Sequence, residues 1–400
     1  MKKILVVGGG NYQVPLIKRI RELGLEAYCA DKNRTAPGFR EANGYRIIDI
    51  LNQKECLDYA KELKIDGVAT YGATITLPTV SFIGECLNLP ALSRETAEIA
   101  SNKYQIKKKL IEFGCNTKGK FAVFHSIDEM LRFVPDEYPC VVKPSDGSGS
   151  KGVVIVQESS QYEAAVNSAF EAARFGEVYV ENFFRGEEYS AEAFIHNNAI
   201  YIYSIVKTNF VRYTSGNTGI SYGHTTPPGI DTDKENAICE EIKKAIRILD
   251  INMGSVNFDV ILSENGRAYI IDCGIRVGQN LIASHIIPLA RGVNEMDMYI
   301  SQVLGEAVDP EPKKNKCIAT KLLITEPGII EAIEPMEQYI GTNGILAVVM
   351  RKKPGDIQRI FTDKSDNCGW VICGGNTVEE AERNAENARI QLLKNIYIKR

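Results

Sequence analysis

The sequence predicts an α/β protein of two or three domains, in which a helix-covered parallel sheet precedes a region richer in antiparallel strands. Over residues 1–92, short apolar runs alternate with amphipathic helical patterns, as in parallel sheets covered by helices. From Phe121 to Asn182, the order strand, helix, strand, strand, helix, strand is that of a small split βαβ module. The 400 residues also exceed what a single hydrophobic core usually organises.

The N-terminal elements follow from apolar runs and from the residues that end them. The first strand is the run Ile4–Val7, and after three glycines the apolar positions from Val14 to Leu23 recur at helical spacing. The other elements expected in this unit are strands at Glu26–Ala30, Tyr45–Ile48 and Gly67–Thr70 and a helix at Gln53–Leu63. The unit is expected to end near Leu92, and a helical pattern then runs from Ser93 to Phe113.

The central elements begin with the split module, whose two middle strands are joined by the glycine-rich stretch VVKPSDGSGSKGV, residues 141–153. Antiparallel strands are expected at YSAEAFI and AIYIYSIV. A loop of roughly twenty residues, Lys207–Pro228, follows, and loops of this length are usually functional or disordered. A helix at Glu235–Leu249 then precedes a hairpin of Ser255–Leu262 and Arg267–Asp272.

The C-terminal region begins after the stretch DPEPKKNK, which is rich in proline and lysine and marks a boundary near residue 312. Its pattern predicts strands at CIATKLLI and ILAVVM and a final helix from Thr377 to Leu393.

Composition and charge argue against several classes of protein. The formal net charge of -4 at pH 7 argues against nucleic acid or an anionic membrane as the main partner. No stretch approaches the ~20 apolar residues of a membrane span, and the first apolar run is too short for a signal peptide, so a cytoplasmic protein is expected. The ten cysteines include no C-x-x-C pair and are interpreted as buried reduced thiols rather than zinc ligands.

The first glycine cluster, in VVGGGNYQ, follows a strand and opens a helix, as in a dinucleotide-binding turn. Asp31 stands near the position of a ribose-binding carboxylate, but Gln13 replaces the third glycine of the G-x-G-x-x-G pattern. An NAD-dependent dehydrogenase is therefore one alternative. The others are a plain βα turn and a helix N-terminus that receives a substrate anion.

The second glycine cluster is not a P-loop, because Lys151 is followed by Gly152 and two β-branched valines rather than by a helix. It is expected to be a hairpin tip whose backbone N–H groups fold over phosphates as a lid. Lys143, on the preceding strand, would reach the same phosphates. An ordinary hairpin tip is the alternative.

Carboxylates and an arginine follow downstream. The segment VYVENFFRGEEYSAE contains a strand, a turn at Gly186 and the paired acids Glu187 and Glu188. The segment NFDVILSENGRAYIIDCGIR places Asp259 and Asp272 on the two strands of one hairpin, and Arg276 follows. Two carboxylates on neighbouring rigid strands suit magnesium, although solvated strand ends would give the same pattern.

This order of lysine strand, glycine lid, strand with turn, acidic hairpin and arginine resembles the ATP-grasp superfamily of carboxylate–amine ligases, over roughly residues 1–300. Within it, the sequence is most similar to the purine-pathway branch: glycinamide ribonucleotide synthetase, the formate-using transformylase and aminoimidazole ribonucleotide carboxylase. The segment ADKNRTAPGFREANGYRIIDILN resembles the pre-grasp domain of the transformylase. Biotin carboxylase, the carbamoyl-phosphate synthetase large chain and L-amino acid ligases are similar at the superfamily level.

The resemblance implies an ATP-grasp fold in three parts. A Rossmann-like pre-grasp domain would span residues 1–95, and the ATP-grasp domain 96–305, with a split-βαβ lid subdomain at about 117–185. A mixed-sheet C-terminal α/β region, 306–400, would pack on the ATP-grasp core.

The resemblance also assigns site residues, motif by motif. Those that would bind ATP are Lys103 and Lys143 as nucleotide lysines, Ser148, Gly149, Ser150 and Gly152 in the lid loop, Glu181, Asn182 and Phe183 at the adenine hinge, Glu188 at the ribose, and His224 where the long loop returns. Asp259 and Asp272 match the metal carboxylates. Asp272 and Arg276 would be catalytic, with Arg276 steadying the acyl-phosphate.

Two departures from the family pattern stand out. Where the family usually reads Glu-x-Asn-x-Arg, this chain reads Asp272-Cys273-Gly274-Ile275-Arg276, so Gly274 replaces the asparagine that often completes the shell of the second metal. The histidine-bearing N-terminal signature of glycinamide ribonucleotide synthetase is also absent.

The implied activity is the ATP-dependent joining of a carboxylate to an amine through an acyl-phosphate. ATP and Mg²⁺ would be the cofactors, with Mn²⁺ as a substitute, and small-molecule carboxylates and amines the partners, without nucleic acid or membrane. The oligomeric state stays open, with a homodimer as one option.

A non-catalytic nucleotide-binding protein is the second alternative function. In simpler readings, Lys107, Lys108 and Lys109 form a solvated helix face, and Glu188 is the exposed partner of Glu187.

Overall fold

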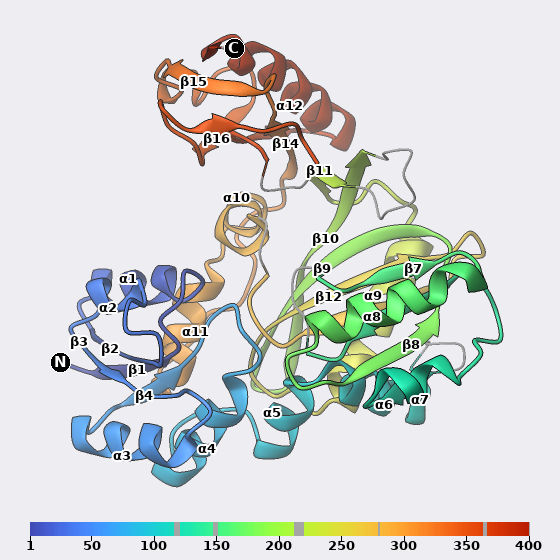
Figure 1. The fold of residues 1–400 in the computed structure, drawn as a ribbon. Coiled ribbons are helices and arrows are strands. Elements are labelled where there is room, and N and C mark those ends of the chain that lie inside the picture. Colours follow the sequence, from blue (N-terminus) through green and yellow to red (C-terminus); the bar gives the residue numbers. More distant parts are fainter. Residues whose placement is uncertain (116–120, 147–150, 212–219, 279–280, 363–365, 400) are drawn as a thin grey trace.

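The computed structural model describes residues 1–115, 121–146, 151–211, 220–278, 281–362 and 366–399. Within these ranges, four sheets and their covering helices form the α/β fold that the sequence predicts. Figure 1 shows the N-terminal unit at the lower left, the central sheets at the right and the C-terminal unit at the top. No helix of these ranges combines the length and the apolarity needed to cross a membrane.

The N-terminal sheet is parallel, with the strand order β3-β2-β1-β4. Its elements are β1 (Lys3–Val7), α1 (Val14–Glu22), β2 (Glu26–Asp31), α2 (Gly38–Glu41), β3 (Gly44–Ile47), α3 (Gln53–Leu63) and β4 (Gly67–Ala69). Successive side chains of β1 enter different cores, because a strand alternates its faces. Ile4 and Val6 pack in the core that includes α1, and Leu5 and Val7 in the core that includes α3.

Three helices lead from this sheet to the centre of the molecule: α4 (Leu77–Leu87), α5 (Arg94–Ala100) and α6 (Lys103–Glu112). The last two begin at side-chain caps. Ser93 accepts a hydrogen bond from the Thr96 N–H, and Asn102 accepts one from the Gln105 N–H. The cap at Asn102 places Lys103 at the first position of α6.

The small central sheet has the order β5-β8-β6-β7, and all its strand pairs are antiparallel. Its elements are β5 (Ala122–Phe124), α7 (Ile127–Leu131), β6 (Cys140–Pro144), β7 (Val154–Val156), a 3-10 turn (Ser159–Gln161), α8 (Tyr162–Ala172) and β8 (Val178–Asn182). Both helices contribute to one apolar core with the sheet, so the predicted split βαβ module is confirmed.

The large sheet is antiparallel, with the order β13-β12-β9-β10-β11-β14-β18-β16. The elements of its central part are β9 (Glu187–His196), β10 (Ala199–Val211), β11 (Ile220–Thr226), α9 (Thr232–Ile248), β12 (Gly254–Leu262), β13 (Ala268–Gly274), a π-helical turn (Ile282–Ile286), α10 (Ile287–Arg291) and α11 (Glu295–Val303). The prediction of a loop at Lys207–Pro228 is wrong for the described residues of this segment, because β10 and β11 pair there. Their serine, threonine and glycine content hid these strands in the sequence.

The C-terminal unit extends the same sheet. Its elements are β14 (Cys317–Leu323), β15 (Gly328–Ile333), a 3-10 turn (Glu337–Tyr339), β16 (Ile345–Met350), β17 (Ile357–Gln358), β18 (Gly369–Gly375), α12 (Val378–Leu393) and β19 (Ile396–Lys399). Strand β14 pairs with β11 on one side and β18 on the other, while β17, β15 and β19 form a separate sheet. Four of these strands, β15, β17, β18 and β19, were not predicted.

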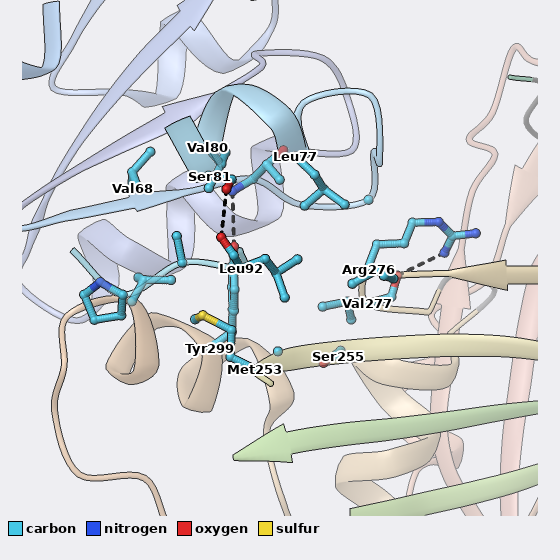
Figure 2. A pocket seen from close by; sticks show the side chains of 17 residues that line it. Val68, Leu77, Val80, Ser81, Leu92, Met253, Ser255, Arg276, Val277 and Tyr299 are labelled. Carbon is cyan, nitrogen blue, oxygen red and sulfur yellow. Dashed lines mark hydrogen bonds between the residues drawn. The ribbon is translucent and has the colours of Figure 1, made fainter. Parts of the chain in front are cut away.

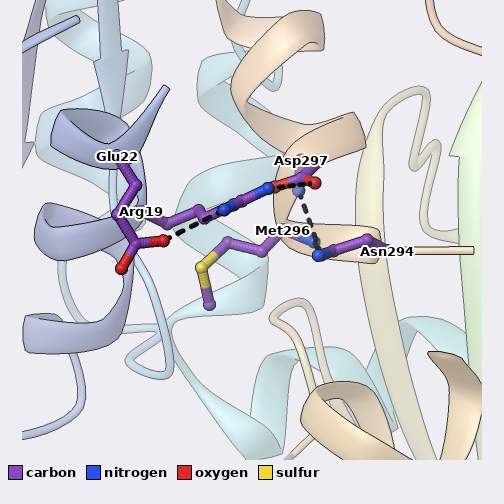
Figure 3. Close-up of polar contacts among 5 residues, drawn as sticks. All are labelled: Arg19, Glu22, Asn294, Met296 and Asp297. Carbon is purple, nitrogen blue, oxygen red and sulfur yellow. Dashed lines mark hydrogen bonds and ion pairs between the residues drawn. The ribbon is translucent and has the colours of Figure 1, made fainter. Parts of the chain in front are cut away.

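Helix α11 returns to the N-terminal unit and holds it against the centre. Its residues Ile300 and Val303 pack in the same apolar core as Ile4 and Leu16. On the surface of this contact, Arg19 of α1 binds both carboxylate oxygens of Asp297, at 2.6 and 2.8 Å (Figure 3). The first turn of α11 therefore has a fixed position relative to both the N-terminal sheet and β12.

Candidate active site

Two carboxylates meet on the edge hairpin of the large sheet. Asp259 of β12 and Asp272 of β13 are direct cross-strand partners, so their side chains share one face. The hairpin sequence predicted both residues, but their facing depended on a register that the pattern alone did not define. A bulge after Asp259 shifts the pairing of the residues that follow.

The opposite face of the same strands is apolar and explains why the carboxylates face outward. Phe258, Val260 and Cys273, the sequence neighbours of the two carboxylates, pack in one core with residues of α6 and α9. Because strand side chains alternate, burying these three residues places Asp259 and Asp272 on the other face. Ser190 of the neighbouring strand β9 donates a hydrogen bond to Asp259 Oδ1 at 2.9 Å.

Lys103 brings a cation to this pair. Its backbone N–H donates to the Ser145 carbonyl at 2.8 Å, and its ammonium group forms an ion pair with Asp272. Burial alone would raise the pKa of Asp272, but Lys103 and Lys143 hold it at about 2. Burial and the neighbouring Asp272 raise the pKa of Asp259. The two carboxylates therefore have opposite pKa shifts.

Lys143 lies in a buried triad with Lys107 and Glu181. Lys143 Nζ is 2.5 Å from Glu181 Oε1, and Lys107 Nζ is 2.9 Å from Glu181 Oε2. The two ammonium groups also donate to backbone carbonyls of β13, at Ile271 and Ile270 respectively. The triad thus ties α6, the small sheet and β13 together beneath the carboxylate pair.

The interpretation of Lys107 as part of a solvated helix face is wrong, because Lys107 is buried in this triad. Its neighbour Lys108 is exposed. Burial lowers the Lys107 pKa. Burial also acts to lower the Lys143 pKa, but the Glu181 carboxylate raises it overall. In Glu181, burial acts to raise the pKa, and the two lysines lower it overall. The side chain of Glu181 is thereby committed to the lysines, which leaves only its backbone for an adenine.

The other residues expected at the hinge lie next to this triad. Asn182 pairs with Cys140 across β8 and β6, and the Phe183 N–H donates to the Pro139 carbonyl at 3.3 Å. Glu188 is half-buried on β9, and burial together with Asp259 raises its pKa to about 7. Its environment therefore differs from that of the exposed Glu187.

Arg276 follows the hairpin and is half-buried, and its Nη1 donates to the Val277 carbonyl at 3.1 Å. A Cβ atom added at Gly274 would lie 3.3 Å from Arg276 Nε. Glycine at position 274 therefore leaves room for the arginine to lie along the strand end. An asparagine there would require the guanidinium to shift by a few tenths of an ångström.

Not all residues expected at the site are brought to it. His224 pairs with Thr320 on β14, and β9 and β10 separate its strand from β12, so it lies three strand spacings, about 14 Å, from the carboxylate pair. Ser148, Gly149 and Ser150 lie outside the described residues. Gly152 has φ +71° and packs against α8, where an added Cβ would lie 2.5 Å from the Ala172 Cβ.

The side chains of Gln13 and Asp31 lie against the N-terminal glycine turn. Gln13 is buried, and its Nε2 donates to the Tyr71 carbonyl at 2.5 Å. A Cβ atom at Gly8 would lie 3.3 Å from the Gln13 side chain. Asp31 accepts hydrogen bonds from the N–H groups of Gly9 and Asn33. The residue that departs from the dinucleotide pattern therefore fills space beside the turn.

A small pocket of about 40 Å³ lies between the N-terminal unit and the central sheet. Val68, Leu77 and Val80 line it from one side, and Met253 and Val277 from the other. Of the described residues that line it, Arg276 alone is charged, and Figure 2 shows its guanidinium directed away from the pocket. Neither the pocket nor the buried acids near it, Glu192 and Glu295, was predicted, because they combine segments distant in sequence.

Comparison with protein families gives two matches. The family described as the ATP-grasp domain matches residues 136–284, which contain Lys143, Glu188 and the acidic hairpin. The family described as L-amino acid ligase C-terminal domain 2 matches residues 321–393 in the C-terminal unit.

Individual relatives are distant. The phosphoribosylamine–glycine ligase of Lactococcus lactis is 28% identical over 207 residues, which cover 50% of this chain and 48% of that protein. The chain thus matches about half the length of that relative. The formate-dependent phosphoribosylglycinamide formyltransferase of Prochlorococcus marinus subsp. pastoris is 28% identical over 425 residues and covers 98% of this chain and 97% of its own. The L-amino acid ligase from Bacillus licheniformis superposes with a TM-score of 0.80 at 21% identity, over 100% of this chain and 99% of that one.

Proposed function

Residues 136–284 match the ATP-grasp domain family, and on this premise we propose that the chain is an ATP-grasp ligase that joins a small carboxylate to an amine through an acyl-phosphate intermediate. The observation that carries the proposal is the polar face on which Asp259, Asp272 and Lys103 lie together, with Lys143 close by. Carboxylates and lysines on one rigid face can hold a nucleoside triphosphate and its metal ion.

The two carboxylates fit magnesium, which prefers oxygen ligands and usually retains several waters. No group of three or more metal-binding side chains occurs among the described residues, so phosphate and water oxygens would complete the shell. Asp259 and Asp272 would hold the ion, and when bound it neutralises charge on the β- and γ-phosphates. Gly274 offers no side-chain ligand, so a higher magnesium requirement is expected than with an asparagine there.

The chain's own residues would act on the remaining parts of the reaction. Lys103 and Lys143 would bind phosphate oxygens, for which Lys103 must exchange part of its contact with Asp272. Glu188 would accept hydrogen bonds from the ribose. Arg276 would bind the carboxylate oxygen that receives the phosphoryl group, because a guanidinium holds such an anion in a fixed orientation. The amine then displaces phosphate to form the amide.

Two kinds of substrate are suggested by the relatives, phosphoribosyl amines and amino acids. The C-terminal match to an L-amino acid ligase domain supports an amino acid. The pocket beside Arg276 supports the same choice, since the described residues that line it include no lysine or further arginine to receive a phosphate. A phosphoribosyl substrate would need such cations.

The test is ATP-dependent phosphate release with an array of carboxylates and amines. Asp272→Asn should reduce the rate by at least 100-fold while the variant stays folded. The matched control is Asp250→Asn, which removes a carboxylate from an exposed position with φ +54°, a conformation that asparagine also tolerates. An active Asp272→Asn enzyme would show that the metal site is misplaced. Binding of ATP without turnover of any substrate would instead support a non-catalytic nucleotide-binding protein.

A further inference from the structure

Two fully buried glutamates lie where α11 meets the central sheet. Glu192 of β9 and Glu295, the first residue of α11, both have 0% of their surface exposed. Burial raises the pKa of each carboxyl, and Glu192 raises that of Glu295 further. Neither residue is needed to hold the nucleotide or the metal in the proposed reaction.

Both carboxylate oxygens of Glu192 have a hydrogen-bond partner. Oε1 accepts from the Gly278 N–H at 2.5 Å, and Oε2 accepts from Asn257 Nδ2 at 3.1 Å. A Cβ atom at Gly278 would lie 2.2 Å from Oε2, so the backbone approaches this carboxylate more closely than any other residue would allow.

Glu295 is different, because only one of its oxygens has a partner. Ser255 Oγ donates to Oε1 at 3.3 Å, whereas Oε2 is buried and has no hydrogen-bond partner among the described residues. Within the same part of the chain, neither glutamate forms an ion pair with lysine or arginine. A buried carboxylate without a cation is costly, and its place in the first turn of α11 offsets only part of that cost.

The pocket of Figure 2 adjoins this pair. Ser255 both lines the pocket and binds Glu295, and Tyr299, one turn after Glu295 on α11, lines it as well. On the other side, Val277 lines the pocket and the next residue, Gly278, binds Glu192. Neither glutamate lines the pocket itself, and the two carboxylates lie directly behind residues that do.

We propose that Glu295, supported by Glu192, binds the ammonium group of the substrate that supplies the amine, and that the pocket holds an apolar side chain of the same molecule. This inference rests on the proposed ligase function and specifies its amine substrate as an amino acid with an apolar side chain. An ammonium group supplies the charge and the donors that Oε2 lacks.

The position agrees with the reaction. Glu192 pairs with Asn257, two residues before Asp259 on β12, a separation of roughly 7 Å along the strand. An amine bound there would lie within a side chain's length of the carboxylate pair.

Calorimetric titration with three probes, in the presence of ADP and Mg²⁺, tests the proposal. L-Leucine has both the ammonium group and the apolar side chain, 4-methylpentanoate lacks only the ammonium, and L-alanine lacks most of the side chain. Wild-type protein should bind L-leucine at least 10-fold more tightly than either analogue. Glu295→Gln should weaken L-leucine binding at least 10-fold and leave 4-methylpentanoate binding unchanged.

The control is Glu379→Gln, which removes a glutamate from the first turn of the exposed end of α12. It should bind L-leucine like the wild type. Equal losses for L-leucine and 4-methylpentanoate in Glu295→Gln, or no L-leucine binding to the wild type, would overturn the proposal. Because binding is measured without turnover, a failure here is separate from a failure of phosphate release, which would count against the ligase function itself.

Discussion

At the scale of single residues, the balance of positive and negative charges in the buried triad determines how much a substitution changes the free energy of unfolding. Lys107, Lys143 and Glu181 carry two positive charges and one negative charge. Glu181→Gln leaves two buried ammonium groups without a carboxylate, and should destabilise the protein by about 3–5 kcal/mol. Lys107→Met instead leaves a balanced pair, and should change the free energy of unfolding by less than about 1 kcal/mol. Urea denaturation of both variants compares them. Equal destabilisation would mean that both lysines are required for packing.

A second residue-scale prediction concerns pH. The Glu188 pKa of about 7 lies above the ordinary value of 4.5. Between these values the folded state binds more protons than the unfolded state, so the contribution of Glu188 to stability falls as pH rises through this window. Relative to wild type, Glu188→Gln should therefore gain about 1–2 kcal/mol between pH 4.5 and 8, after allowance for the solvent that reaches this half-buried side chain. Chemical denaturation at several pH values measures the difference. A constant difference across the window would contradict the raised pKa.

At the scale of elements, two glycines in the turns that precede β7 and β8 separate the effect of backbone strain from that of packing. Gly152 and Gly176 have φ values of +71° and +67°, so alanine would be strained at both. An added Cβ meets nothing within 4 Å at Gly176, but lies 2.5 Å from the Ala172 Cβ at Gly152. Gly176→Ala should cost about 1 kcal/mol, and Gly152→Ala about 1–3 kcal/mol more. Melting temperatures of the two variants test the difference, and equal melting temperatures would show that α8 moves aside freely.

The elements also show what sequence patterns can and cannot predict. Regular alternation and helical spacing predicted the parallel N-terminal sheet, the split module and the acidic hairpin. Lys107 was misread because its neighbours Lys108 and Lys109 gave the segment a solvated appearance, and only packing on β13 distinguishes it. Glu295 gave no signal, because its burial depends on contacts with Ser255, 40 positions earlier in the chain.

At the scale of the whole molecule, the large sheet crosses the proposed division at residue 305. Strand β11 pairs with β14, so hydrogen bonds link the proposed ATP-grasp domain of 96–305 to the region 306–400. The proposed N-terminal domain, 1–95, is connected through α11 and the Arg19–Asp297 contact. The pocket proposed for the amine substrate lies at this second connection.

The last prediction concerns the nucleotide that stabilises the whole molecule. The N-terminal turn has Gln13 beside it and Asp31 engaged by backbone N–H groups, so NAD would have to displace both. The lysines and carboxylates of the candidate site instead join α6, the small sheet and the hairpin, and a triphosphate bound there would connect all three. A ligand at 100 times its Kd adds about 2.7 kcal/mol to the free energy of unfolding. ATP with Mg²⁺ should therefore raise the melting temperature by a few degrees, and NAD should leave it unchanged. GTP should also have no effect, because adenine is expected at the hinge.

Lys103→Met should reduce the rise with ATP, and Lys32→Met, at an exposed position beside the N-terminal turn, should retain it. A rise with NAD that Lys103→Met leaves intact would place the nucleotide in the N-terminal unit and contradict the assignment.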